Sequence, residues 1–206
     1  MTITPSLLLE QVVLGRRSVR RFLPRPVPDR LVEELVALAA AAPAPHHSRP
    51  WRFLVLSSAA RERLVMAMEG AWLRDLQADG HRPEDAGGLL ERSRRRILSA
   101  PVLLLACLEL SGARPWPDER RRRAERDMFV QSLGAALQNL MLAAHARGLG
   151  SCLMGAPLFC QDEVRAALGL PEGWEPAFLV ELGYPDPDYR PRPRPPLDLS
   201  SLLQRA

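Results

Sequence analysis

The order of apolar and polar positions along the chain predicts a mixture of helices and strands. Asp29 is placed to cap a helix that runs through residues 31–38, and Ser57 and Ser58 are placed to cap the next one. In chain order, we predict helices over residues 7–14, 29–38, 59–68 and 161–168, and short strands over residues 53–56, 151–154 and 177–182.

Two longer segments predict the centre of the fold. Residues 101–108 form a nearly continuous apolar run, which is typical of a strand covered on both faces. Asp118 opens a helix that extends to about residue 147 and ends before Gly148. Apolar residues lie all around this helix, so we expect it to be buried on every side. Small residues at positions 134–136 offer a surface that a second helix could approach closely.

The strands are separated by helices, so the pattern is that of an α+β or α/β domain without hairpins. Residues 69–96 are polar and Gly-rich around position 87, then basic, and are interpreted as helix, loop and helix. Residues 185–206 are rich in Pro and Arg and predict an extended C-terminal tail. At 206 residues the chain is most simply a single domain with this tail.

Composition narrows the class of protein. A content of 47% hydrophobic and 25% charged residues is typical of globular domains, and no run of about 18 apolar residues predicts a membrane span. Three cysteines do not suit a disulfide framework, and the N-terminus lacks the features of a secretory signal, so we expect a cytoplasmic protein. The net charge of +4 is too small to predict nucleic-acid binding and mildly favours an anionic small ligand.

Two segments near the N-terminus carry most of the candidate chemistry. Residues 16–22, Arg-Arg-Ser-Val-Arg-Arg-Phe, combine arginines with a hydroxyl, a set of donors that suits a phosphate. The alternative interpretation of these residues is a solvated basic turn. Residues 43–53, Pro-Ala-Pro-His-His-Ser-Arg-Pro-Trp-Arg-Phe, form a Pro-rich loop before a predicted strand, and such loops position polar groups over ligands.

Both segments resemble the flavin-binding signature of the nitroreductase family. Four residues match its Arg-x-Ser-x-Arg-x-Phe stretch: Arg16, Ser18, Arg20 and Phe22. Four more match its Pro-rich loop: Pro43, Pro50, Trp51 and Phe53. His47 and Arg49 replace the usual Asn and Gln. With these replacements, the loop sequence more closely resembles one branch of the family, the C-terminal domain of the bifunctional enzyme that makes coenzyme F-420. The resemblance extends from about residue 8 to residue 199.

The resemblance implies an α+β, nitroreductase-like fold, with a central sheet flanked by helices and the long helix at the interface of a homodimer. It also implies FMN as the cofactor, bound in the seam between two chains. The residues at flavin-contacting positions are Arg16, Arg17, Ser18, Arg20, Met154, Gly155, Arg192 and Arg194. An ordinary turn is the alternative for residues 154–155, and a disordered basic tail is the alternative for residues 192–194.

His46 and His47 are the candidate catalytic residues. A histidine can donate a proton near neutral pH or bind an anion when charged. The pair is placed either to hold the acidic, phosphorylated tail of a substrate or to deliver a proton after hydride transfer. Two exposed loop histidines without a role are the competing interpretation. A metal site is not expected, because adjacent histidines on one loop lack the remaining ligands.

The resemblance further implies an FMN-dependent oxidoreductase that reduces the dehydro precursor of coenzyme F-420, an 8-hydroxy-5-deazaflavin. A nicotinamide or another donor would then re-reduce the flavin. The alternatives are a broad NAD(P)H nitroreductase or quinone reductase, and a protein that binds flavin or deazaflavin without turnover. No Gly-x-Gly-x-x-Gly, Gly-x-Ser-x-Gly or Cys-x-x-Cys motif predicts a Rossmann, serine-hydrolase or dithiol site instead.

Overall fold

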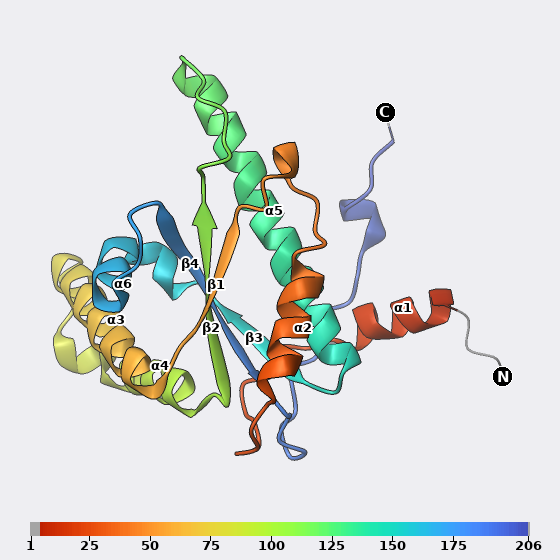
Figure 1. Ribbon diagram of the computed structural model, residues 1–206. Helices are drawn as coiled ribbons and strands as arrows, with labels where there is room; N and C mark the ends of the chain where they lie inside the picture. Colours follow the sequence, from red (N-terminus) through yellow and green to blue (C-terminus); the bar gives the residue numbers. More distant parts are fainter. Residues whose placement is uncertain (1–4, 206) are drawn as a thin grey trace.

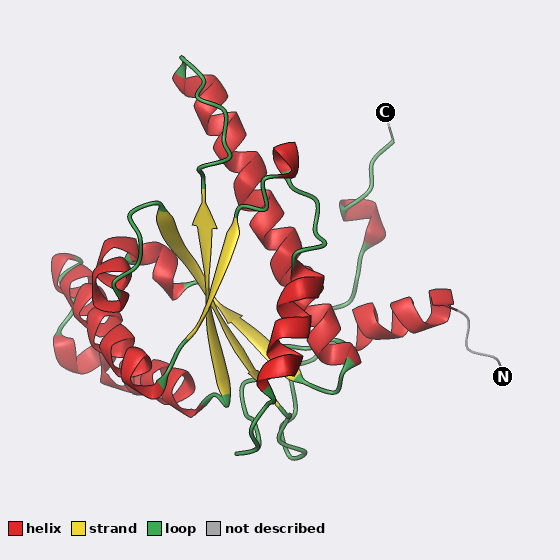
Figure 2. Cartoon of the chain, viewed as in Figure 1, coloured by secondary structure: helices red, strands yellow, loops and turns green. Residues whose placement is uncertain are grey.

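A four-stranded sheet lies between two groups of helices (Figures 1 and 2). The computed structural model describes residues 5–205, with the side chains of all but residues 5, 6 and 83–86. The strands are β1 (Trp51–Val55), β2 (Val102–Glu109), β3 (Gly150–Met154) and β4 (Trp174–Gly183). They follow the order β1-β2-β4-β3, and every neighbouring pair is antiparallel. The expected α+β class, with a sheet flanked by helices, is confirmed.

Each face of the sheet carries its own hydrophobic core. One face packs against α2 (Asp29–Ala39) and α5 (Glu119–Ala146), and the other against α3 (Ser58–Ala78), α4 (Pro83–Ser99) and α6 (Gln161–Leu168). Because side chains alternate along a strand, Leu104 of β2 belongs to the first core and Leu103 to the second. The apolar run of residues 102–108 is therefore buried on both faces, as its pattern predicted.

Several helix boundaries differ from the sequence prediction. Asp29 is the first residue of α2, because Pro28 occupies the N-cap position. Ser57 caps α3 as expected, but the helix continues for 21 residues. The turn that follows lies at residues 79–82 rather than around position 87, because Gly80 takes up a left-handed conformation (φ 81°) and Pro83 opens α4.

Helix α5 is buried on one side only. Its cap is confirmed, since the Asp118 carboxylate accepts a hydrogen bond of 2.9 Å from the Arg121 backbone amide. The expectation of burial on every side was wrong for this chain, because Val130 is 46% exposed and Met128 is 43% exposed. Gly134 also faces open space. Helix α2 and the sheet cover one side of α5, and none of the residues that the structure describes covers Met128, Val130 and Gly134 on the other side.

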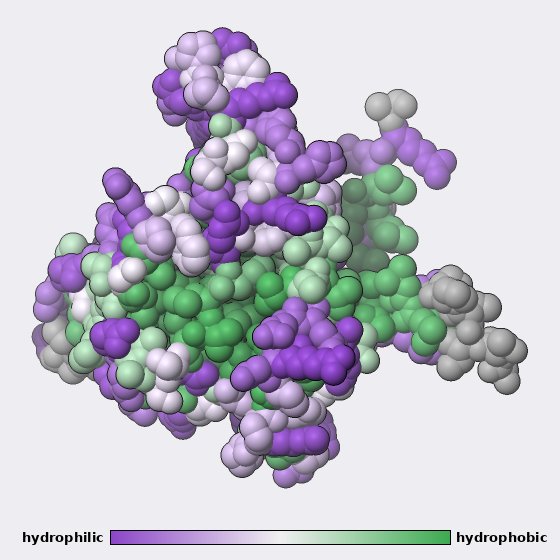
Figure 3. All heavy atoms as spheres, in the orientation of Figure 1, coloured by the Kyte–Doolittle hydropathy of each residue, from purple (hydrophilic) through white to green (hydrophobic). Residues whose placement is uncertain are grey.

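Two segments project from the body beside the C-terminal end of α5: α1 (Pro5–Gly15) and the tail after residue 184 (Figure 1). Both are rich in exposed leucines: Leu7, Leu8, Leu9 and Leu14 in α1, and Leu197, Leu199, Leu202 and Leu203 in the tail. Hydrophobic residues also gather over the middle of the face shown in Figure 3. Within residues 5–205, no helix has the length and apolar character needed to cross a membrane.

Candidate functional site

The arginine-rich segment of residues 16–22 lies against β3. Ser18 and Ser151 form a parallel bridge, and the Val19 backbone amide donates a hydrogen bond of 2.9 Å to the Ser151 carbonyl. A Cβ atom on Gly150 would lie 2.7 Å from Val19 Cβ, so only glycine allows the two backbones to approach this closely. The main chain therefore fixes the position of the segment, whatever its side chains bind.

The C-terminal tail returns to the same segment. The Arg194 guanidinium donates a hydrogen bond of 2.6 Å to the Arg16 carbonyl, and Arg17 donates to the Arg192 carbonyl. The Tyr189 hydroxyl donates to the Ser18 carbonyl at 3.3 Å. The structure thus brings together the two basic motifs that the sequence pointed to, although about 175 residues separate them.

The arginines gathered here form no ion pair with an acidic residue that the structure describes, although the charge of the buried Glu181 acts on Arg20. Among the ion pairs of the described residues, none involves Arg16, Arg17, Arg20, Arg192 or Arg194. Burial, followed by the positive charges of Arg194 and Arg17, lowers the pKa of Arg16. Arg21 differs, because it pairs with Asp186 at 2.7 Å and links the tail to the segment. A group of crowded, unpaired guanidinium ions suits a phosphate, which would relieve their mutual repulsion.

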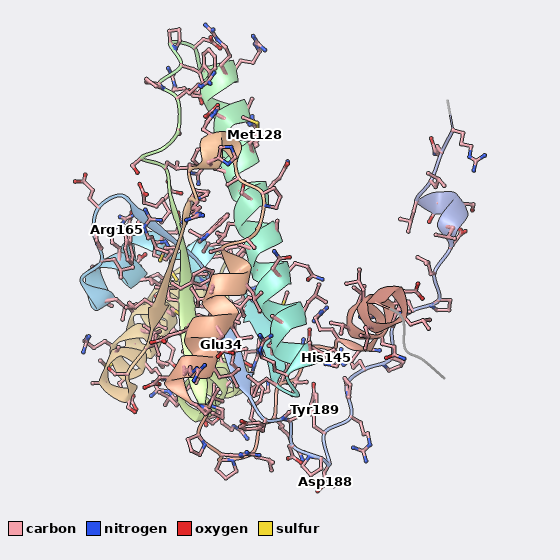
Figure 4. The ribbon with its side chains drawn as sticks, turned by 45° about the vertical axis from the view of Figure 1, so that its right-hand side comes forward. Glu34, Met128, His145, Arg165, Asp188 and Tyr189 are labelled. Atoms are coloured by element: carbon pink, nitrogen blue, oxygen red, sulfur yellow. The ribbon has the colours of Figure 1, made fainter. Side chains whose placement is uncertain are left out.

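A small cavity of about 180 Å³ opens beside this arginine cluster, and two of its lining residues escaped the sequence analysis. His145 lies in the last turn of α5, and Tyr189 lies in the tail; Figure 4 shows both near the end of that helix. Arg16 and Ser151 also line the cavity. Neither His145 nor Tyr189 carries a local sequence signal, because only the fold brings the helix end and the tail to this place.

Met154 and Gly155 lie at the other end of β3. Four residues of extended chain separate Ser151 from Gly155, a distance of about 13 Å. Gly155 and Ala156 line a larger cavity of about 530 Å³, whose remaining walls come mainly from α3 and α4. Its apolar lining includes Met68, Trp72, Leu76, Leu90, Ile97 and Phe159. This volume is within the range of small-molecule sites. A cationic cluster and an apolar cavity therefore lie at opposite ends of one strand.

The histidine loop lies elsewhere in the chain. His46 is part of the short 3-10 helix η1 (Pro45–His47), and its Nε2 atom is 2.9 Å from Glu125 Oε1 in the N-terminal half of α5. His145, beside the arginine cluster, follows 20 residues later in the same helix, which is about 30 Å along its axis. Within one chain, the histidine loop therefore lies far from the arginine cluster.

Glu125 fixes His46 in place. This carboxylate is buried and also accepts hydrogen bonds of 3.1 Å from the Arg114 backbone amide and from Trp116 Nε1. These bonds, with the Arg114 amide first, lower the pKa of Glu125. Because His46 Nε2 is held by this acceptor, His47 is the histidine of the pair with the greater freedom to meet a ligand.

The backbone of the histidine loop is strained. His46, His47 and Arg49 have φ angles of 56°, 52° and 49°, the left-handed region that residues with a Cβ seldom adopt. Such conformations concentrate at ligand-binding segments, where the surrounding structure enforces them. Among the described residues, no group of three His, Cys, Asp or Glu side chains could hold a metal ion.

Comparison with known proteins matches this geometry to one family. The model of the nitroreductase family matches residues 13–184. An NADH dehydrogenase of Thermus thermophilus is 29% identical over 94% of this chain and 95% of its own. The FMN-dependent nitroreductase NfnB of Mycobacterium smegmatis, solved with NADPH, has a TM-score of 0.72 and 25% identity over 98% of this chain and 100% of its own.

A BluB-like flavoprotein from Clostridium difficile shares the fold, with a TM-score of 0.80 and 24% identity over 96% of this chain and 98% of its own. These likenesses extend over nearly the entire chain. They confirm the nitroreductase-like fold that residues 16–22 and 43–53 led us to expect.

Proposed function

This chain belongs to the nitroreductase family and is an FMN-dependent oxidoreductase; from that premise we propose that it passes electrons from NAD(P)H to a small aromatic or quinone-like acceptor. The observation that carries this proposal is the arrangement along β3, with unpaired arginines at one end and an apolar cavity at the other. FMN has a phosphate and a flat ring system at its two ends. When bound, it supplies the hydride-transfer chemistry that protein side chains lack.

Each end of β3 has its own part in the proposal. Arg16, Arg17 and Arg194 would hold the phosphate, with the Ser18 hydroxyl as a further donor. Arg20 and Arg192, which the family resemblance adds to this set, lie in the same two segments of the chain. Met154 and Gly155 would lie along the ring system. The residues present fit the cofactor, because Arg16, Arg17 and Arg194 form no ion pair with a described carboxylate.

The apolar cavity would receive the acceptor. Its rim carries Glu69, Asp75 and Asp79; among the described side chains, only Glu69 has an ion-pair partner, Arg94. Net negative charge at the rim favours a neutral or cationic acceptor over a polyanion. This cavity therefore supports a nitroaromatic or quinone substrate better than an acidic, phosphorylated one.

We also propose that the chain acts as a homodimer in which α5 packs against α5 of a second copy. The outer face of α5 and the leucines of α1 and the tail are exposed in one chain. In an antiparallel, twofold pairing, the N-terminal half of one helix meets the C-terminal half of the other. The histidine loop of one copy would then lie near the arginine cluster of the other, which closes the 30 Å gap within one chain.

The dehydro precursor of coenzyme F-420 is a second candidate substrate. The amino-acid sequence of residues 43–50 supports this candidate, and so does the strained backbone of the loop that carries His47 and Arg49. Replacing His47 by Ala should then reduce turnover of the precursor far more than turnover of a nitroaromatic. An equal loss on both substrates, or no turnover of the precursor by the wild type, would remove this candidate.

A cytoplasmic location completes the proposal. Cys107, Cys152 and Cys160 are all free and buried, which suits a reducing compartment. Burial raises the pKa of the Cys107 thiol to about 12, so this cysteine is an inert part of the core.

The test is the visible absorption spectrum of the purified protein, followed by anaerobic addition of NADH or NADPH and then of a quinone. We expect bound FMN that is bleached by the nicotinamide and restored by the quinone. The double variant Arg16→Ala/Arg20→Ala should be colourless. Arg190→Ala should keep its flavin, because the hydrogen bonds of this exposed tail arginine to described residues go to the Pro187 and Tyr189 carbonyls. Wild-type protein that takes up no added FMN would refute the proposal.

A further inference from the structure

A carboxylate is buried inside the sheet close to the proposed cofactor site. Glu181 lies on β4, opposite Cys152 of β3 and Leu103 of β2, and its side chain is 1% exposed. Arg96 Nη2, from the last turn of α4, lies 2.6 Å from Glu181 Oε1. Neither carboxylate oxygen nor Arg96 Nε has a well-aligned hydrogen-bond partner among the described groups.

The groups that act on Glu181 come from three elements around it. Arg96 comes from α4 and also reaches Cys152 Sγ at 3.4 Å. Arg20 comes from the segment of residues 16–22, and its charge acts on both Glu181 and Cys152. The partner on β2 is the apolar Leu103. A single buried carboxylate is therefore in contact with Arg96 and acts on Arg20 through its charge.

Stability does not account for a carboxylate in this position. Glu181 belongs to the face of β4 that also carries Leu179, within a core of leucines. Desolvation raises the pKa of Glu181 to about 6, and the charges of Arg96 and Arg20 offset only part of this effect. Replacing buried ion pairs by apolar residues is often neutral or stabilising. A residue that costs stability at such a place is typical of a functional site.

The location indicates the function. Cys152 directly follows Ser151, at the arginine cluster, and precedes Met154 and Gly155, at the apolar cavity. Arg96 and Arg20 thus lie beside the middle of the strand along which the cofactor is proposed to lie. We propose that Glu181 is a positioning residue of the FMN site, whose carboxylate holds Arg96 by direct contact and attracts Arg20 towards β3. This inference rests on the proposed function.

Glu181 could affect FMN binding by positioning the arginines or merely by its negative charge. The two roles predict opposite changes in FMN affinity for Glu181→Gln. If Glu181 acted only through its charge, removing it would make the site more positive and tighten binding of the FMN anion. If it holds the two arginines, its loss frees them, and FMN binding at pH 7.5 should weaken about tenfold. Apoprotein is titrated with FMN, and quenching of flavin fluorescence gives the dissociation constant.

Glu175→Gln is the matched control. Glu175 is on the same strand, is partly buried and pairs with an arginine, Arg126, at 2.7 Å, but it lies at the far end of β4 from Glu181. This variant should bind FMN as the wild type does. Glu181→Leu is the second variant, because leucine suits the surrounding core; it should fold and show the same loss of affinity. Unchanged or tighter FMN binding by both Glu181 variants would overturn the inference.

The pH dependence of binding gives a readout that a merely structural role would not change. Glu181 is charged above about pH 6 and holds the arginines only then, so wild-type affinity should fall below that pH. The phosphate of FMN itself titrates near pH 6, so the informative quantity is the difference between variants. Glu175→Gln should retain the whole wild-type profile, and Glu181→Gln should retain only the part due to the phosphate. Identical profiles would overturn the inference, whereas failure of every form to bind FMN would refute the proposed function instead.

Discussion

At the scale of single residues, two substitutions at position 47 distinguish the contribution of the His47 side chain from the cost of its backbone conformation. With φ at 52°, a Cβ costs about 1–2 kcal/mol that glycine does not incur. We predict that His47→Gly is more stable than His47→Ala by about 1 kcal/mol in urea unfolding. Both variants lack the imidazole, so any loss of turnover should be the same in the two. Equal stabilities would show that position 47 is not held in the left-handed region.

The raised pKa of Glu181 leads to a prediction about the stability of the protein as well as about FMN binding. Its folded pKa of about 6 lies above the ordinary 4.5, so the fold favours the protonated form. The stability associated with that form is fully present below pH 4.5 and is lost as the pH rises through 6. Glu181→Gln should therefore stabilise the apoprotein by about 2 kcal/mol at pH 8. Thermal melts should show this gain disappearing towards pH 4, and a variant less stable than the wild type at pH 8 would contradict the expectation.

At the scale of elements, the contact between residues 16–22 and β3 depends on Gly150. A methyl group there would meet Val19 Cβ at 2.7 Å, and a Cβ atom cannot rotate away as the end of a long side chain can. We predict that Gly150→Ala displaces the arginine-rich segment and weakens FMN binding at least tenfold, with a loss of stability of about 1–3 kcal/mol. Gly173→Ala is the control, since a Cβ there meets nothing within 4 Å. Normal FMN affinity of Gly150→Ala would show that the segment does not depend on this contact.

The elements also show which parts of the fold were accessible from sequence. The buried strand β2, the capped helix α5 and the short helix α6 follow from patterns that a few adjacent residues complete. The end of α3 did not, because its polar last turns have no apolar periodicity of their own, whereas the helix as a whole packs against α4 and α6. Burial all around α5 was also inferred wrongly, since an apolar surface left open by one chain has the same composition as one that is covered.

The candidate site also contains some residues that could be predicted from the sequence and others that could not. The arginines of residues 16–20 form a local motif, and the sequence alone predicts that they bind a phosphate. Tyr189 and His145 join them only through contacts between distant segments, and no local pattern marks either residue. Glu181 is indistinguishable in sequence from a surface residue at one end of a strand. Its role depends on a register that places it opposite Cys152 and beneath Arg96.

At the scale of the whole molecule, the proposed dimer depends on the outer face of α5. Gly134 lies on that face with nothing within 4 Å of its Cβ position, so leucine there fits the single chain and improves helix propensity. We predict that Gly134→Leu stays folded but becomes monomeric by sedimentation. Its FMN affinity should fall, because the histidine loop of the second copy would no longer reach the arginine cluster about 30 Å away.

Gly87→Leu separates the effect of the interface from that of adding a leucine to a helix. Gly87 lies in α4, on the other face of the sheet, and a Cβ there also meets nothing within 4 Å. This variant should remain dimeric and retain its flavin. If Gly134→Leu is also dimeric with full FMN affinity, α5 is not the dimer interface. In that case His47 and the arginine cluster would belong to separate sites, and the role of the histidine loop in electron transfer would have to be abandoned.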